Sequence, residues 1–158
     1  MKKNPNDRKV IVITDFDQLT ALTDKPVICR FELDGATIEL PCKRLSDVVQ
    51  EEVYALHRKA TPPWDKSLGP AGDYNHYAQN YLKARADNAN RARALIIYTG
   101  CPAIAAKKPG LTDIEAVYGF VRGLLPENIL EIIALTIQKG GVDLRQRADF
   151  TSTPDSEN

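Results

Sequence analysis

Residues 27–41 alternate between apolar and polar positions in two runs, VICRFEL and ATIELP, on either side of Asp34-Gly35. An Asp-Gly pair suits a two-residue type I′ turn, because both central positions of that turn need a positive φ. The turn sets the register and so predicts a β-hairpin with one apolar and one polar face. The predicted pairs are Leu33 with Ala36, Phe31 with Ile38, Cys29 with Leu40, Glu32 with Thr37, and Arg30 with Glu39.

The run VIVIT at residues 10–14 predicts a further strand within an N-terminal extension, residues 1–24. We expect it to join the same sheet, because a two-stranded ribbon alone is only marginally stable. The following DFDQLTAL fits either a short helix or a turn, and the pattern leaves both open.

Four later stretches place apolar residues at three- and four-residue spacing, which is typical of amphipathic helices. Ser46 or Asp47 can cap the first, and Thr112 and Glu115 have the spacing of a capping box for the third. Gly100 and Pro102 break the second, and Pro126 suits the first turn of the fourth. The predicted helices span about 46–60, 74–99, 112–125 and 127–139.

The fourth predicted helix carries apolar residues that point in nearly every direction. A helix of this kind is either the centre of the core or shared with another molecule, and Gly140-Gly141 ends it. The Pro- and Gly-rich segment 61–73 between the first two helices predicts a loop. We therefore expect one α+β domain over residues 25–145, an N-terminal β-hairpin or small antiparallel sheet followed by a bundle of about four helices, with a polar flexible tail at 146–158.

The chain has 158 residues and balances 21 Lys and Arg against 21 Asp and Glu. This neutral charge argues against a protein that coats nucleic acid. No apolar run approaches the roughly 18 residues of a membrane span, and the basic N-terminus precedes only four apolar residues, so we expect no secretory signal. Three cysteines, odd in number and far apart, favour a reducing compartment, and we expect a cytoplasmic protein.

The candidate chemical groups favour no catalytic site. In the predicted register Cys42 lies diagonal to Cys29, about 7–8 Å away, which is too far for a disulfide. Cys101 precedes a helix break, where a thiol can be activated, but no base is assigned to it, and a core role is favoured. His57 and His76 lack metal-ligand spacing. We therefore expect no enzyme, no metal and no cofactor.

The charges are unevenly distributed along the chain. Residues 83–108 hold six basic residues and one acid, whereas residues 113–131 hold four acids and one base. A basic helix beside tyrosines can contact nucleic acid, but we favour core tyrosines and a solvated basic face, because the acidic segment can supply the counter-charge. The candidate contacts are Lys83, Arg85, Arg91 and Arg93, with Tyr74, Tyr77 and Tyr81 nearby.

The segment FELDGATIELPCKRLS, a hairpin that runs directly into an amphipathic helix, resembles the tail assembly chaperones of long-tailed bacteriophages. The helical remainder and the polar C-terminal tail also fit, so that the resemblance spans roughly residues 25–145. The chain departs from this family in residues 1–24 and in the Pro-rich loop 61–73. Either segment also fits a different phage structural protein.

The resemblance implies a non-enzymatic, virus-encoded factor of the host cytoplasm. Members of this family bind the tape-measure protein, keep that long hydrophobic helix soluble and help to recruit the major tail subunit. They tend to self-associate, and many also exist as a longer, frameshifted form. The family has no catalytic set, so no individual residue carries over to this chain.

The residues themselves suggest where a partner would bind. The two C-terminal helices can present a groove to an amphipathic helix, and oppositely charged helices can pair between copies. A Trp in a Pro-rich loop is either an interface anchor or a cap on the core. The expected packing and interaction residues are Val117, Val121, Ile129, Ile132 and Ile133, with Trp64 as a further candidate. The alternative is a small phage structural or nucleic-acid-associated protein that uses the basic helix 83–93.

Overall fold

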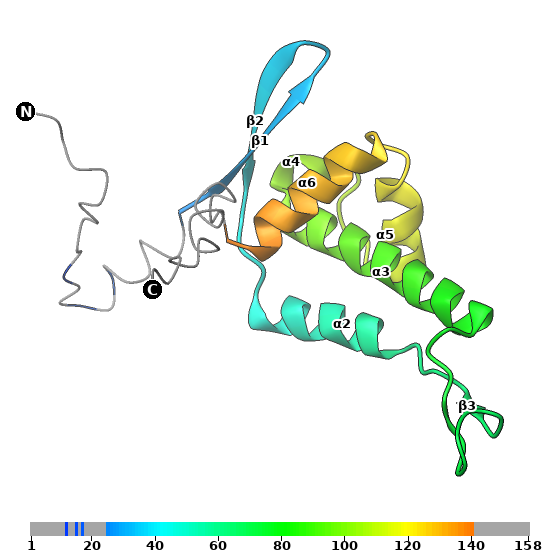
Figure 1. Cartoon of the computed structure of the whole chain (residues 1–158). Coiled ribbons are helices and arrows are strands. Elements are labelled where there is room, and N and C mark those ends of the chain that lie inside the picture. The colour runs from blue at the N-terminus through cyan, green and yellow to red at the C-terminus, as the bar shows by residue number, and fades with distance from the viewer. Residues whose placement is uncertain (1–11, 13–14, 16, 18–24, 141–158) are drawn as a thin grey trace, which may run out of the picture.

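The chain forms a small antiparallel sheet followed by helices, which confirms the predicted α+β class (Figure 1). The computed structural model describes residues 12, 15, 17 and 25–140. The predicted strand over 10–14, apart from Val12, and the predicted tail over 146–158 therefore lie outside the described residues. The elements are β1 (Val27–Leu33), β2 (Ala36–Cys42), α2 (Asp47–Arg58), β3 (Trp64–Asp65), β4 (Asp73–Tyr74), α3 (Gln79–Gly100), α4 (Pro102–Ala105), α5 (Ile114–Val121) and α6 (Glu127–Gln138).

The hairpin of β1 and β2 has the predicted register at every pair. Asp34 and Gly35 have φ angles of +52° and +76°, as a type I′ turn requires. On the outer face the Arg30 Nε donates to the Glu39 Oε1 at 3.0 Å. Because both side chains are exposed, this ion pair contributes little to stability. It is a consequence of the register, which places Arg30 opposite Glu39.

Helix α6 covers the apolar face of the hairpin, mainly along β1. Val27, Cys29 and Phe31 of β1 are buried there, and Cys42 is buried at the end of β2. Each fully buried side chain of this size contributes about 1.5–3 kcal/mol, so this contact joins the sheet firmly to the helices.

Helix α2 begins at Asp47 because Ser46 caps it, its side chain accepting a hydrogen bond from the backbone N–H of Val49. Its main contact is α3, and Val53 is its one buried residue. Val48 and Tyr54 are exposed on its surface. The apolar stripe of α2 is therefore wider than the surface that the helix buries.

The second long helix begins at Gln79, so the predicted start at residue 74 is wrong. Tyr74 belongs instead to β4, which pairs with β3, and residues 75–78 form a turn that leads into α3. The backbone N–H of Asn75 donates to the Pro63 carbonyl at 2.8 Å, and the Asn75 side chain accepts from the N–H of Tyr77 at 3.0 Å. These bonds offer the backbone an alternative to the helix, as Asn side chains commonly do. The predicted loop 61–73 thus contains strand pairing.

Helix α3 ends at Gly100 and the chain turns at Cys101, which has an extended backbone, before α4 starts at Pro102. The predicted break at Gly100 and Pro102 is confirmed, but the four-residue α4 was not predicted. The backbone N–H of Lys43 donates to the Gly100 carbonyl at 2.8 Å, which ties the end of β2 to the end of α3.

The last two helices are shorter than predicted. Asp113 caps α5 by accepting from the N–H of Ala116 at 2.9 Å, so the predicted capping box of Thr112 and Glu115 is wrong. The helix ends at Val121, and a turn follows in which the N–H of Leu124 donates a hydrogen bond to the Val121 carbonyl. Pro126 occupies the N-cap of α6 with ψ 145°, one position before the predicted first turn.

Helix α3 lies in the middle of the helical part, with α2 on one side and α5 and α6 on the other (Figure 1). The β3–β4 hairpin projects beyond the start of α3, at the opposite end from the β1–β2 hairpin. The second half of α3 is buried among its neighbours, whereas its first two turns are largely exposed. The core therefore forms around Ala92, Ala94, Ile96 and Ile97 of α3 and Ile129, Ile133 and Ile137 of α6.

Candidate functional site

Four of the five apolar residues expected to form a packing and interaction surface lie inside the core. Val117, Val121, Ile129 and Ile133 are at most 4% exposed. Their side chains pack within the chain and cannot meet a partner while the fold is intact. Ile132 differs, because 38% of its surface is exposed. Helix α6 thus buries most of its apolar residues in the core, between β1 and α3.

The basic helix is partly neutralised within the chain. Arg91 forms a bidentate pair with Glu115 of α5, one arm measuring 3.3 Å, and Arg93 donates to Glu127 of α6 at 3.3 Å. The hydrogen bond to Glu115 raises the pKa of the Arg91 guanidinium. The acidic segment therefore supplies an internal counter-charge, as expected. Lys83 and Arg85 are exposed and make no ion pair with any other described residue.

The tyrosines near this helix do not form the core stripe that the sequence predicts. Tyr74 is 53% exposed and Tyr77 is 85% exposed, and both precede α3. Tyr81 is half-buried and packs edge-on against His76, with ring centroids 6.0 Å apart. The prediction failed because it extended the helical period through a segment whose backbone is not helical.

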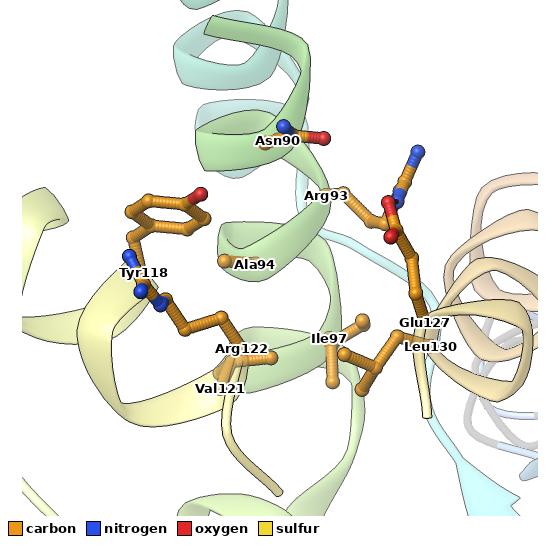
Figure 2. Close-up of a pocket in the computed structure, with 9 residues that line it drawn as sticks. All are labelled: Asn90, Arg93, Ala94, Ile97, Tyr118, Val121, Arg122, Glu127 and Leu130. Carbon is orange, nitrogen blue, oxygen red and sulfur yellow. Dashed lines mark hydrogen bonds and ion pairs between the residues drawn. The ribbon is translucent and has the colours of Figure 1, made fainter. Parts of the chain in front are cut away.

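A small pocket lies between α3, α5 and α6 and has a volume of about 180 Å³. Figure 2 shows Arg122 extended beside the ring of Tyr118, and Glu127 reaching toward Arg93. The Arg122 guanidinium carbon lies 5.5 Å from the Tyr118 ring centroid, within the range of a cation–π contact. The pocket is smaller than the 300 Å³ or so of usual ligand sites, and its polar groups contact one another, so it is best explained as packing.

A larger and more apolar groove runs between α2, α3 and the start of α5, and has a volume of about 540 Å³. We call it the α2–α3 groove. Leu56, Leu95, Leu111 and Ile114 are only partly buried along it, so they still present apolar surface. Charged groups stand at its edge. The lining residues are Glu52, Ala55, Leu56, Lys59, Leu95, Tyr98, Thr99, Leu111, Thr112, Ile114 and Val117.

One wall of the α2–α3 groove is anchored by a buried tyrosine. The Tyr98 hydroxyl donates to the Lys108 carbonyl at 2.7 Å and accepts from the Leu111 N–H at 3.0 Å. These two bonds hold the connection between α4 and α5 against α3. The opposite wall, α2, has no comparable anchor to α5 among the described residues.

Trp64 lies in the segment 61–78, which we call the aromatic finger. The indole is 52% exposed and packs edge-on against Tyr74, with ring centroids 5.1 Å apart. Of the two predicted roles for Trp64, the cap on the core does not apply, since it is not among the residues packed against the core. Asp65 organises the finger by accepting hydrogen bonds from Ser67 and Asn75.

The three cysteines come together although they are far apart in sequence. Cys29, Cys42 and Cys101 are free thiols and are at most 2% exposed. The absence of a Cys29–Cys42 disulfide and the core position of Cys101 confirm two predictions. A hydrogen bond from the Cys42 thiol lowers the pKa of Cys101, the same contact raises the pKa of Cys42, and burial raises that of Cys29.

The described residues contain no group of three or more His, Cys, Asp or Glu side chains able to hold a metal ion. His57 lies near the end of α2, whereas His76 lies in the aromatic finger. Among the described residues, no carboxylate or imidazole is one of the groups that shift the pKa of Cys101.

The apolar spacing over residues 46–60 predicts an amphipathic helix but does not predict the α2–α3 groove. Leu56 and Leu95 lie in two of the predicted amphipathic helices, over 46–60 and 74–99, and nothing in the local pattern shows that the two apolar faces meet incompletely. The available signal was the stripe of the first helix, which has more apolar positions than one helix–helix contact can cover.

None of the helices in the described part is both long and apolar enough to cross a membrane. No protein family model, no curated protein and no solved structure matches this chain.

Proposed function

We propose that this chain is a non-enzymatic morphogenesis factor of a long-tailed bacteriophage, which binds the tape-measure protein and helps to recruit tail subunits in the host cytoplasm. The proposal rests on the resemblance of FELDGATIELPCKRLS to tail assembly chaperones. In the fold, that segment forms the β1–β2 hairpin and leads into α2, the arrangement on which the resemblance depends.

The single observation that carries this proposal is the α2–α3 groove. An amphipathic helix binds a protein by placing apolar anchors, spaced three or four residues apart, into a groove between helices. Leu56, Leu95 and Ile114 offer apolar contacts from three different elements. When a long apolar helix binds in this groove, its apolar side chains leave water and no longer drive aggregation. A chaperone of a tape-measure protein must achieve this.

The construction of the groove suits a partner that varies in sequence along its length. The α3 and α5 wall is fixed by the core and by Tyr98, whereas α2 has one fully buried residue, Val53, with Val49 and Leu56 partly buried. A helix with one fully buried residue can shift to fit different side chains more readily than a helix at the centre of the core. The edge carries both Glu52 and Lys59, so either charge sign on the partner helix can be matched.

The test is co-expression with the tape-measure protein of the same phage, followed by measurement of how much of that protein remains soluble and co-purifies. Ala55→Arg places a bulky charge in the groove from an exposed position of α2, and Val48→Arg is the matched control on the same helix outside the groove. We expect Ala55→Arg to raise the Kd about tenfold, which corresponds to roughly 1.4 kcal/mol of binding free energy, and so to lower recovery. Val48→Arg should leave it unchanged.

Equal recovery with both variants would reject the groove as the binding site. Loss with both variants would place the contact on the exposed face of α2 instead. Far-UV circular dichroism of each variant checks that α2 stays folded.

The alternative function, nucleic-acid binding, now depends on fewer groups. Arg91 and Arg93 are occupied by Glu115 and Glu127, which leaves Lys83 and Arg85 for phosphate contacts. Two phosphate contacts give a shallow dependence of affinity on salt. A titration of single-stranded DNA at two salt concentrations separates the two functions, because salt-sensitive binding that Lys83→Ala and Arg85→Ala abolish would favour the alternative.

A further inference from the structure

The buried thiols of Cys42 and Cys101 lie at a junction that joins the sheet to the helices. Cys42 ends β2, and Cys101 separates α3 from α4. The hydrogen bond of 2.8 Å from the Lys43 N–H to the Gly100 carbonyl connects the residues next to both cysteines. The side chains are 2% and 0% exposed, so both point into the same interior.

The backbone bond between Lys43 and Gly100 favours the pair Cys42–Cys101, and the hairpin register disfavours the pair Cys29–Cys42. In the observed register Cys29 faces Leu40 and Cys42 faces Val27, so these two thiols are diagonal neighbours. Diagonal neighbours are about 7–8 Å apart, beyond the usual 4.4–6.8 Å between the Cα atoms of a disulfide. Cys29 is covered by α6, the helix that packs along β1.

The contact between Cys42 and Cys101 is that of a donor and an acceptor. The Cys42 thiol faces the Cys101 sulfur, and this contact is the largest cause that lowers the pKa of Cys101. A thiol directed at the sulfur stabilises its negative charge, so the Cys101 thiolate is the nucleophile of the pair.

We propose that Cys42 and Cys101 are a disulfide-forming pair, oxidised by a small-molecule disulfide such as oxidised glutathione. The Cys101 thiolate attacks one sulfur of glutathione disulfide, which forms a mixed disulfide and releases one glutathione thiolate. Cys42 then gives up its proton and attacks the Cys101 sulfur, which forms the intramolecular bond and releases the second glutathione. Two protein thiols are oxidised and one glutathione disulfide is reduced.

The disulfide would cross-link the base of the β1–β2 hairpin to the junction of α3 and α4. It closes a long loop that contains α2 and the aromatic finger, and a long loop is where a cross-link removes most entropy from the unfolded chain. Since both sulfurs are buried, the oxidant reaches them only when the hairpin base opens. The rate of oxidation therefore reports that opening.

The experiment uses the full chain, folded in buffer without denaturant and incubated with oxidised glutathione. Intact mass spectrometry should show the loss of two hydrogens, and a non-reducing digest should yield one linked pair of peptides, containing Cys42 and Cys101. Cys29→Ser should retain this bond, whereas Cys42→Ser and Cys101→Ser should lose it. The oxidised wild-type chain should melt about 5 °C or more above the reduced chain.

Three results would overturn the proposal. They are a disulfide that contains Cys29, glutathione adducts that never resolve into an internal bond, and oxidation that occurs only in denaturant. The wild-type peptide map decides among them without any variant, so misfolding of a Cys→Ser protein cannot obscure the answer.

Discussion

Gly100 lies directly against Ile137, where the end of α3 crosses α6. A Cβ atom at position 100 would lie 2.6 Å from the Cγ2 and 2.8 Å from the Cδ1 of Ile137. Ile137 is 2% exposed and has core atoms on its other sides. The absence of a side chain at Gly100 therefore allows the two central helices to approach each other.

Replacement of this glycine should destabilise the fold. We expect Gly100→Ala to lower the free energy of unfolding by about 1–3 kcal/mol, the usual effect of overpacking a core. Urea denaturation followed by circular dichroism measures the change. The matched control is Gly119→Ala, since Gly119 is exposed in α5 with nothing within 4 Å of its added Cβ. That control should raise stability by about 0.5–1 kcal/mol through helix propensity. A loss of similar size in both variants would contradict the steric explanation.

Removal of one hydroxyl should loosen the fixed wall of the α2–α3 groove. Tyr98→Phe leaves the Leu111 N–H and the Lys108 carbonyl without their partner, at a cost of about 1–3 kcal/mol in unfolding free energy. Tyr54→Phe, at a position 54% exposed, should change stability by less than about 0.5 kcal/mol. Hydrogen exchange at Leu111 should accelerate in Tyr98→Phe only, and unchanged exchange would show that the bond does not hold this segment.

The aromatic finger depends on a glycine beneath the indole. Gly72 has a φ of +82°, and an added Cβ would lie 2.9 Å from the Cζ2 of Trp64. Gly69 has a similar φ of +74° but open space around it. Gly72→Ala should therefore shift the fluorescence and near-UV dichroism of the single Trp, whereas Gly69→Ala should add strain without moving the indole. Identical spectra for the two variants would mean that backbone strain alone matters.

The finger should also respond to acid. Hydrogen bonds from the Ser67 side chain and backbone, with a smaller contribution from Asn75, lower the pKa of Asp65. A carboxyl whose pKa is lowered in the folded state stabilises that state above its unfolded pKa of about 3.9, and this contribution disappears as the pH falls through the folded pKa. Trp64 fluorescence should therefore change below about pH 4. Asp65→Asn should remove that step, and its persistence in the variant would assign the transition to another group.

The β1–β2 hairpin and two of the helix ends followed from local rules. Asp34-Gly35 determines the turn, because few other dipeptides adopt two positive φ angles. The turn then determines which residues face each other across the hairpin, from Leu33–Ala36 to Val27–Cys42. Ser46 and Gly100 marked helix ends in the same way. These features depend on residues a few positions apart, which is the range over which a periodic pattern carries information.

Only the tertiary structure decided what those elements place together. Arg91 meets Glu115 across a separation of 24 residues, and Cys42 meets Cys101 across a longer one. The start of α3 at Gln79 also depends on a bond between Asn75 and Pro63, which the helical period cannot reveal. Contacts of this kind depend on how helix faces of unequal width pack in three dimensions. The sequence therefore determined the β1–β2 register and the presence of the four longer helices, whereas packing decided which apolar surface became core and which remained as the α2–α3 groove.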